Sequence, residues 1–326
     1  MPKLTMVQAI NLALHEEMAQ DDRVLVLGED VGLDGGVFRV TDGIFEKFGE
    51  DRALDTPLAE SGILGTAIGM AVAGLRPVCE MQFSGFSYLM IGQWEGNATR
   101  LRSRTQGQHT CPLVVRMPYG GGVRALEHHS ESREATYATF PGGKVVIPSS
   151  PRNARALMLA AIRDPDPVVF MEPKHSYRSF REEVPEKAEV MPIGKAQIER
   201  EGDQLTVVAW GAMMRPTIKA VDKISQETGA SIEVIDLLTI APLDSATICQ
   251  SVRKTGRCVI VQEAPRSFGV ASEIIACLND EVLLYLEAPV KRLTGYDVVT
   301  PYFGREKSYI PPVSRIVRGL RETLDF

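Results

Sequence analysis

The sequence lacks the features that mark disulfide-bonded, metal-binding or membrane proteins. Its five cysteines are odd in number, widely scattered and without the close pairs of zinc or redox motifs. We therefore expect reduced cysteines in the core, and neither a disulfide framework nor a zinc site. No apolar run approaches the roughly 18 residues that a membrane span needs, and the segment 1–20 is amphipathic and acidic rather than signal-like. These absences predict a cytoplasmic protein.

The chain also lacks a strong excess of either charge. Its net charge of −6 gives no electrostatic reason to expect a nucleic acid or an anionic membrane as partner. With 326 residues, 44% hydrophobic and 24% charged, the composition is that of an ordinary globular protein long enough for two domains. Small molecules or other proteins are the expected partners.

Three glycine-rich segments, at 32–36, 62–74 and 120–123, do not match a phosphate-binding loop. The sequence has no G-x-x-x-x-G-K-[ST], and the segment after Gly62 has the wrong spacing for a dinucleotide fingerprint. This argues against a P-loop enzyme and against a nicotinamide dehydrogenase. The segment from Ser61 to Gly74 instead predicts a helix whose stripe of small residues allows another backbone to approach closely.

Short β-branched runs alternate with helical patterns along the whole chain, which is typical of parallel sheets covered by helices on both faces. The predicted strands lie at 24–30, 76–83, 112–118, 144–148, 167–173, 205–211, 232–237 and 258–264. Thr5 is a candidate cap for the first helix, and Pro216 suits a first helical turn. A polar stretch at 174–203 separates two sets of strands. The sequence thus predicts an α/β fold of two domains, 1–190 and 191–326, each with a mainly parallel sheet.

The runs DTPLAESGILG at 55–65 and GLRPVCEMQFSGFSY at 74–88 resemble the β subunits of pyruvate and branched-chain 2-oxo acid dehydrogenases. Further matching segments follow in the family's order along nearly the whole chain, among them GEDVG at 28–32, HHSES at 128–132, PGGKVVIPS at 141–149 and LEAPVKRLTGYD at 286–297. The resemblance implies a transketolase-like pyrimidine-binding domain followed by a transketolase C-terminal-like domain.

The resemblance also implies a cofactor and a partner chain. In this family the β subunit receives the aminopyrimidine of thiamine diphosphate, while an α subunit holds the diphosphate and magnesium through a GDG…NN motif. No Gly-Asp-Gly occurs in this chain. We therefore expect an active site shared with an α subunit in an α2β2 heterotetramer. The implied reaction is oxidative decarboxylation of a 2-oxo acid, with acyl transfer to the lipoyl group of an acyltransferase core that docks on the second domain.

Two catalytic residues follow from the resemblance. Glu60 would act as a general acid/base toward the aminopyrimidine ring; read alone, it is a glutamate favoured by the dipole of the helix that it enters. His129 would orient reactants or donate a proton to them during acyl transfer, a role suited to a side chain that titrates near neutrality. Its neighbour His128 is the alternative, because one sequence does not reveal which ring faces the cofactor.

Weaker matches concern the lining of the site and a metal. Leu58, Gln82 and Phe86 match residues that line the aminopyrimidine, with core packing as the plain alternative. Asp164 and Asp166 match a potassium-binding loop, in which backbone carbonyls complete the ligand set. The carbonyls concerned are those of Leu113, Ala161 and Ile162. A DPDP segment is also an ordinary turn.

The sequence leaves the substrate open. Phe86 favours pyruvate, whereas HHSES at 128–132 and GYD at 295–297 favour branched-chain acids. An acetoin dehydrogenase β subunit shares the cofactor and much of the motif set. A non-catalytic docking scaffold is the alternative from another class, but a scaffold has no use for an acid at Glu60. Departures from the family pattern occur at Gly92, Arg133 and Gly143, where relatives usually carry Asp, Pro and Leu.

Overall fold

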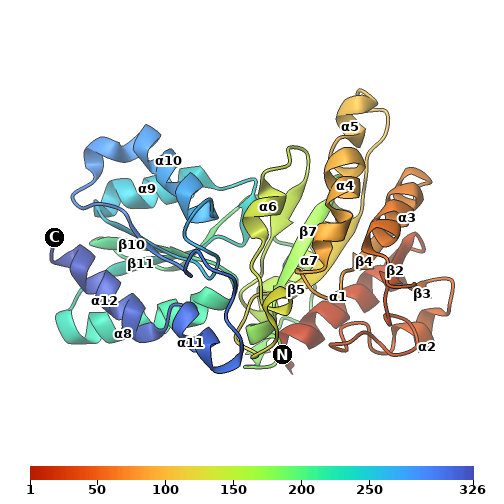
Figure 1. Cartoon of the computed structure of the whole chain (residues 1–326), viewed down its shortest axis with the longest axis horizontal. Coiled ribbons are helices and arrows are strands. Elements are labelled where there is room, and N and C mark those ends of the chain that lie inside the picture. Colours follow the sequence, from red (N-terminus) through yellow and green to blue (C-terminus); the bar gives the residue numbers. More distant parts are fainter.

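The computed structural model describes all 326 residues. The first part of the chain forms most of a seven-stranded sheet in which all neighbouring strands are parallel except β12 and β6. In spatial order the strands are β12 (Thr239–Ala241), β6 (Lys144–Val146), β7 (Val168–Pro173), β5 (Val114–Tyr119), β4 (Arg76–Glu80), β2 (Val24–Gly28) and β3 (Ala53–Asp55). This sheet lies in the right half of Figure 1.

The second part of the chain forms a five-stranded sheet, in the left half of Figure 1. In spatial order its strands are β14 (Lys291–Leu293), β13 (Cys258–Val261), β10 (Leu205–Ala209), β11 (Ile232–Asp236) and β9 (Gln197–Arg200). Only β9 runs antiparallel to its neighbour. A short ribbon pairs β1 (Lys3–Leu4) with β8 (Glu182–Glu183). All eight predicted strands are present, and the predicted mainly parallel α/β fold is confirmed.

The first helix begins where local chemistry predicts. Thr5 accepts a hydrogen bond from the Gln8 N–H and closes a capping box at the start of the first helix. The glycine-rich segment after Glu60 is helical, as predicted, and Pro216 lies in the first turn of its helix. The longer helices are α1 (Met6–Gln20), α3 (Glu60–Val72), α7 (Pro151–Arg163), α8 (Met214–Thr228), α9 (Ser245–Thr255), α10 (Val270–Val282) and α12 (Val313–Leu324).

Shorter helical segments connect these elements. They are α2 (Ile44–Phe48), η1 (Ser87–Met90), α4 (Ile91–Gln93), the π-helical η2 (Trp94–Ala98), α5 (Leu101–Arg104), η3 (Glu127–His129), α6 (Glu134–Ala138), η4 (Lys174–Ser176), η5 (Gly211–Met213), η6 (Leu283–Tyr285), η7 (Phe303–Arg305) and α11 (Glu306–Tyr309). None of the helices is both long and apolar enough to cross a membrane.

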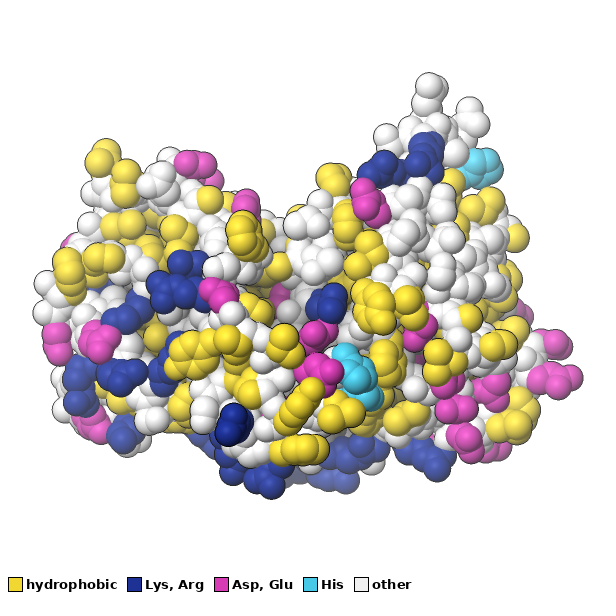
Figure 2. Space-filling model, in the orientation of Figure 1, with side chains coloured by type: hydrophobic (Ala, Val, Ile, Leu, Met, Phe, Trp, Pro, Cys, Tyr) yellow, Lys and Arg dark blue, Asp and Glu magenta, His cyan; other side chains and the backbone are white.

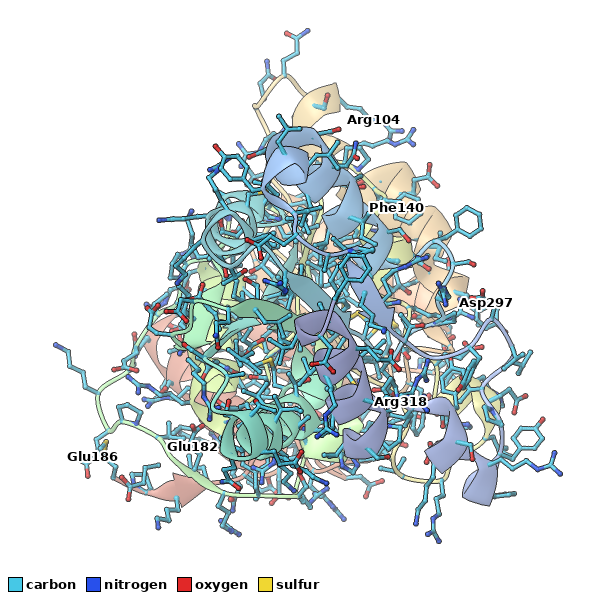
Figure 3. All side chains as sticks on the ribbon, turned by 90° about the vertical axis from the view of Figure 1, so that its left-hand side faces the viewer. Arg104, Phe140, Glu182, Glu186, Asp297 and Arg318 are labelled. Carbon is cyan, nitrogen blue, oxygen red and sulfur yellow. The ribbon has the colours of Figure 1, made fainter.

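Side chains alternate along the buried strands and so supply two layers of core. On β2, Val24 and Val26 pack with α1 and α7, whereas Leu25 and Leu27 belong to a cluster of 36 buried residues that continues into the second sheet. A third cluster lies between the second sheet and helices α8 and α12. Figure 3 shows α12, which carries Arg318, on the outer side of that sheet. The continuous middle cluster joins the two halves of the molecule.

The expected division at residues 190 and 191 lies in the extended segment between β8 and β9. One strand crosses this division, because Thr239 and Ala241 of β12 pair with β6 at the edge of the first sheet. The sequence did not predict β12, whose three residues are too short to give a periodic pattern. The two parts therefore share a sheet edge as well as a core, and the exact boundary stays a prediction.

Candidate active site

Glu60 stands at the first position of α3, with Ala59 as the capping position before it. Its side chain is 5% exposed, and Oε2 has no hydrogen-bond partner. A buried carboxyl oxygen without a partner costs free energy, on the order of 1–3 kcal/mol. The helix N-terminus offsets part of this cost by favouring negative charge. A free carboxyl oxygen in such a place is suited to a ligand that brings its own donor.

Other polar groups meet Glu60 at the carboxyl ends of neighbouring strands. Glu29 follows β2, and its pKa is raised by burial, by the charge of Asp30 and by the charge of Glu60. Gln82, two residues beyond β4, donates to Asp30 at 3.4 Å. The carboxyl edge of an open α/β sheet is the usual place for ligands. Glu60, Gln82 and Glu29 therefore share one edge of the first sheet, and Leu58 lies exposed just before α3.

Aromatic rings bring the predicted histidine to the same edge. The ring of His129 lies 4.2 Å from that of Phe83 and 5.2 Å from that of Phe86, between ring centroids. Gly85 allows this approach, because a Cβ atom there would lie 1.6 Å from the carbonyl oxygen of His128. The structure thus brings Phe86 and His129 into contact across two loops, which the sequence spacing does not reveal.

The two adjacent histidines differ in surroundings. His129 Nδ1 is buried and has no hydrogen-bond partner. Burial lowers the pKa of His129, and the charges of His128 and Lys174 lower it further. The side chain of His128 is 37% exposed and its Nδ1 lies 3.3 Å from the Glu127 carboxylate. His129 therefore offers a free, buried ring nitrogen, whereas His128 lies beside a carboxylate.

Buried charges that the sequence did not single out lie beneath this edge. Arg116, at 1% exposure, pairs with Glu80 and with Glu172 at 2.7 Å, and joins strands β4, β5 and β7. Lys174, at 3% exposure, has no hydrogen bond and lies 5.2 Å above the ring of Phe83. Burial lowers the pKa of Lys174 to about 8. Their position in the sequence could have indicated them, because each of these charged residues lies in or next to a predicted strand.

The candidate residues do not line any of the four main cavities, which have volumes of 280 to 670 Å³. Large apolar side chains are instead exposed near the candidate residues in the sequence: Leu33, Leu58, Tyr88, Leu89, Val123 and Leu126, each between 43% and 71% exposed. Figure 2 shows hydrophobic side chains around acidic and histidine side chains in the middle of one face. An exposed apolar surface around buried polar groups is typical of a protein interface.

The predicted potassium ligands are already engaged by the chain's own groups. The carbonyl oxygens of Leu113 and Ala161 accept backbone N–H groups, and that of Ile162 accepts from Arg76 at 2.8 Å. Lys144 Nζ lies 2.6 Å from Asp164, and Arg102 lies 2.6 Å from Asp166. These groups have partners within the chain, and the potassium site stays a prediction from resemblance. Elsewhere the structure has no group of three or more His, Cys, Asp or Glu side chains arranged to hold a metal ion.

Comparisons with known proteins give the family. Residues 2–179 match the model of the transketolase pyrimidine-binding domain, and residues 194–316 match that of the transketolase C-terminal domain. The chain is 48% identical over 326 residues to the pyruvate dehydrogenase E1 component subunit beta of Bacillus subtilis, with both chains covered completely. The chain belongs to the transketolase-like family that includes the pyruvate dehydrogenase E1 β subunits. The resemblance seen in the sequence is confirmed at this level, and pyruvate and branched-chain members are not distinguished by it.

Other relatives agree. The proteins of the same name from Acholeplasma laidlawii and Staphylococcus aureus (strain N315) are each 47% identical, over 98% and 100% of this chain and 97% and 100% of their own. Among solved structures, an inactive β4 tetramer of a split-gene transketolase superposes with a TM-score of 0.82 over 99% of both chains. At 21% identity, that likeness bears on the fold alone. Use of thiamine diphosphate follows from the family.

Proposed function

We propose that this chain is the β subunit of a thiamine-diphosphate-dependent pyruvate dehydrogenase E1 component, active only with an α subunit in an α2β2 heterotetramer. The observation that carries the proposal is the unpartnered carboxyl oxygen of Glu60, 5% exposed at the start of α3. Most buried carboxyl oxygens have a hydrogen-bond partner within the protein, so an unpartnered one favours a functional role. The full-length relatives named as pyruvate dehydrogenase β subunits support the same reaction.

Each candidate residue has a role in this proposal. When bound, thiamine diphosphate would supply the nucleophilic carbon on which decarboxylation of a 2-oxo acid depends. Glu60 would hold a proton against the aminopyrimidine nitrogen that lies far from the amino group, as a general acid/base. Leu58, Gln82 and Phe86 would line that ring.

His129 would act later, in acyl transfer to the lipoyl group of an acyltransferase core. Because burial lowers its pKa, the ring is largely neutral at pH 7 and its free Nδ1 can accept a proton. The proposal therefore separates two tasks on one surface: Glu60 serves the cofactor, and His129 serves the reactants.

Exposed apolar side chains and the lack of a diphosphate-binding motif support the need for an α subunit. Exposed apolar side chains stand near the candidate residues in the sequence and would form one face with them, and no Gly-Asp-Gly occurs in the chain. An α subunit would cover this face and hold the cofactor's diphosphate and magnesium. Burying the apolar rim against that subunit would also exclude water from Glu60 and strengthen its interaction with the ring.

Pyruvate is favoured as substrate by the names of the relatives. Branched-chain 2-oxo acids and acetoin are the alternatives, and much of the pocket that separates them would belong to the α subunit. The test is to co-express this chain with an α chain that carries GDG…NN and to assay pyruvate, 2-oxoisovalerate and acetoin. We expect pyruvate to have the highest kcat/KM. An assembled tetramer that decarboxylates no 2-oxo acid would overturn the proposal.

A further inference from the structure

The glycine-rich segment Gly120–Arg124 has no part in the proposed function, yet it leads directly from β5 to the η3 turn that carries His129. Gly120, Gly122 and Arg124 have φ angles of 80°, 89° and 60°. The Gly120 N–H donates to the carbonyl of Glu131 at 3.0 Å and closes the base of the loop. A loop of this composition has much conformational freedom to lose, so something outside it must fix its shape.

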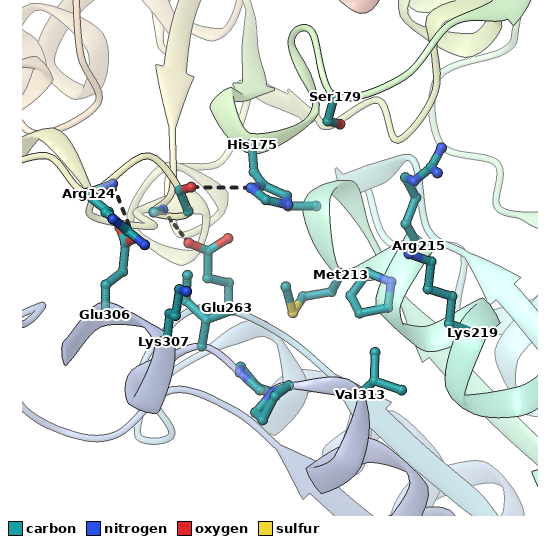
Figure 4. A pocket seen from close by; sticks show the side chains of 17 residues that line it. Arg124, His175, Ser179, Met213, Arg215, Lys219, Glu263, Glu306, Lys307 and Val313 are labelled. Carbon is teal, nitrogen blue, oxygen red and sulfur yellow. Dashed lines mark hydrogen bonds between the residues drawn. The ribbon is translucent and has the colours of Figure 1, made fainter. Parts of the chain in front are cut away.

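The second domain supplies that restraint through two buried glutamates. Glu263, two residues after β13, accepts a hydrogen bond from the backbone N–H of Gly121. Glu306, the first residue of α11, accepts from the backbone N–H of Arg124 at 3.2 Å. Figure 4 shows both acids reaching the loop beside a cavity of about 530 Å³ between the two halves of the chain.

The glycines are what allow the two acids to approach. A Cβ atom on Gly120 would lie 2.9 Å from Glu263 Oε2, and one on Gly121 would lie 2.6 Å from Glu306 Oε1. Real Cβ atoms do not come so close, so any side chain at these positions would displace the acids. The glycine sequence of one domain and the acids of the other are therefore complementary.

A second, electrostatic link runs through Lys174. Glu263 and Glu306 raise the pKa of Lys174 against the effect of its burial, and Lys174 in turn lowers the pKa of His129. Lys174 also lies over the ring of Phe83, which packs edge-on against His129. Glu263 and Glu306 thus contact the loop that carries His129 and also interact electrostatically with Lys174, the cation near His129.

We infer that Glu263 and Glu306 are positioning residues for His129, so that the second domain, beyond docking partners, holds the loop on which acyl transfer depends. The inference rests on the proposed function. Each acid acts through the backbone of the loop. Misplacing a reacting group by about 1 Å costs up to roughly 10²-fold in rate, so loss of either contact should be visible in kinetics.

The test uses Glu263→Ala in the enzyme assembled with its α subunit. We expect the overall, lipoyl-dependent rate to fall about tenfold or more, within the range that misplacement allows. Decarboxylation measured with an artificial electron acceptor should fall much less. Glu263→Gln keeps an oxygen acceptor for the Gly121 N–H and should restore most of the overall rate. Hydrogen exchange of residues 120–129 should rise in Glu263→Ala and not in Glu263→Gln.

Glu233→Ala is the matched control. Glu233 lies in the same domain, is 1% exposed against 5% for Glu263, and also accepts from a glycine N–H, that of Gly202. It has no contact with the loop, so its removal should change stability without separating the two half-reactions. Glu306→Ala tests the second contact and replaces Glu263→Ala should that variant fail to assemble. In a His129→Ala background, Glu263→Ala should cause little further loss, because both changes act on one step.

Equal loss of both half-reactions in Glu263→Ala, or the same split in Glu233→Ala, would overturn the inference and leave the acids a structural role alone. Wild-type rates and exchange in both Glu263→Ala and Glu306→Ala would do the same, while the proposed function would stand on Glu60 and His129. An inactive wild-type tetramer would refute the proposed function instead. Hydrogen exchange would still report in that case whether the two acids hold the loop.

Discussion

Replacing Glu60 by glutamine should lower activity and at the same time preserve or raise stability. The exchange keeps the length and shape of the side chain and removes its proton donor and its charge. Loss of a general acid/base costs about 10²–10⁴-fold in rate. We therefore expect Glu60→Gln to lower both the decarboxylation rate and the overall rate by at least about 10²-fold in the assembled enzyme.

The expected effect on stability has the opposite sign. Glu60 is 5% exposed with one oxygen unpartnered, and its charge contributes to the raised pKa of Glu29. Removing the charge relieves desolvation and repulsion but loses a favourable contact with the helix dipole of about 0.3–1 kcal/mol. The glutamine amide is still a buried polar group, so the cost of an unsatisfied group, about 1–3 kcal/mol, is only partly removed and the net gain should be at most about 1 kcal/mol. For a chain of 326 residues, a gain of about 1 kcal/mol raises Tm by only about 1–2 °C, because the entropy of unfolding grows with chain length.

The assay pairs steady-state rates of the reconstituted enzyme with thermal unfolding of the same samples. Calorimetry with thiamine diphosphate adds a check, because a lost hydrogen bond to the ring should also weaken binding. Wild-type rates in Glu60→Gln would refute the reasoning. A large fall in Tm would refute it too, since it would trace the lost activity to unfolding and mean that the Glu60 oxygens have partners.

Three further predictions follow from other parts of the molecule. His129→Ala should reduce the overall reaction more than decarboxylation measured with an artificial acceptor, and the assignment fails if only His128→Ala gives this split. Burial raises the pKa of Asp236 to about 8 from an ordinary 3.8. Between these pH values the folded chain keeps a proton that the unfolded chain releases. The free energy of unfolding therefore falls by up to roughly 1.4 kcal/mol per pH unit as pH rises from about 4 to 8. Asp236→Asn should flatten this slope in unfolding measurements, and an unchanged slope would contradict it. Potassium should raise the Tm of Lys144→Gln but not that of the wild type, because Lys144 already pairs with Asp164 in the wild type. A higher wild-type Tm in potassium chloride than in choline chloride would instead support the potassium site predicted from resemblance.

Much of the fold could be predicted because buried parallel strands leave a simple pattern. The runs at 24–30 and 205–211 are apolar on both faces, and both became central strands. The edge strands β3, β9, β12 and β14 were missed. Each is three or four residues long and has partly exposed positions. These strands therefore lack the continuous apolar run that marks a central strand.

The site was predicted less completely, for a physical reason. Glu60 and His129 stand in short runs that the family shares, whereas Glu29, Lys174 and Glu263 matter through charges that reach them across the fold. Nothing in the local sequence gives the surroundings of Lys174 or the approach of Glu263 to Gly121. The glycines at 120–122 were visible as a motif. The structural need for glycine there comes from a contact with residues more than 140 positions away, which the sequence does not reveal.

The division of labour between the two parts of the chain follows from this geometry. A half-site on an open face needs its reactive groups fixed before a partner arrives, because each side chain ordered on binding would cost free energy. Glu60 is fixed by the start of α3, and Phe86 by its contacts with Phe83 and the two histidines. Within its own domain the loop of His129 is held at its base, by His175 beside the Gly122 carbonyl oxygen and by the rings of Phe83 and Phe86. The backbone N–H groups of Gly121 and Arg124 donate instead to the second domain. A restraint from the second domain meets this need, and it would make formation of the domain interface a condition for a competent acyl-transfer site.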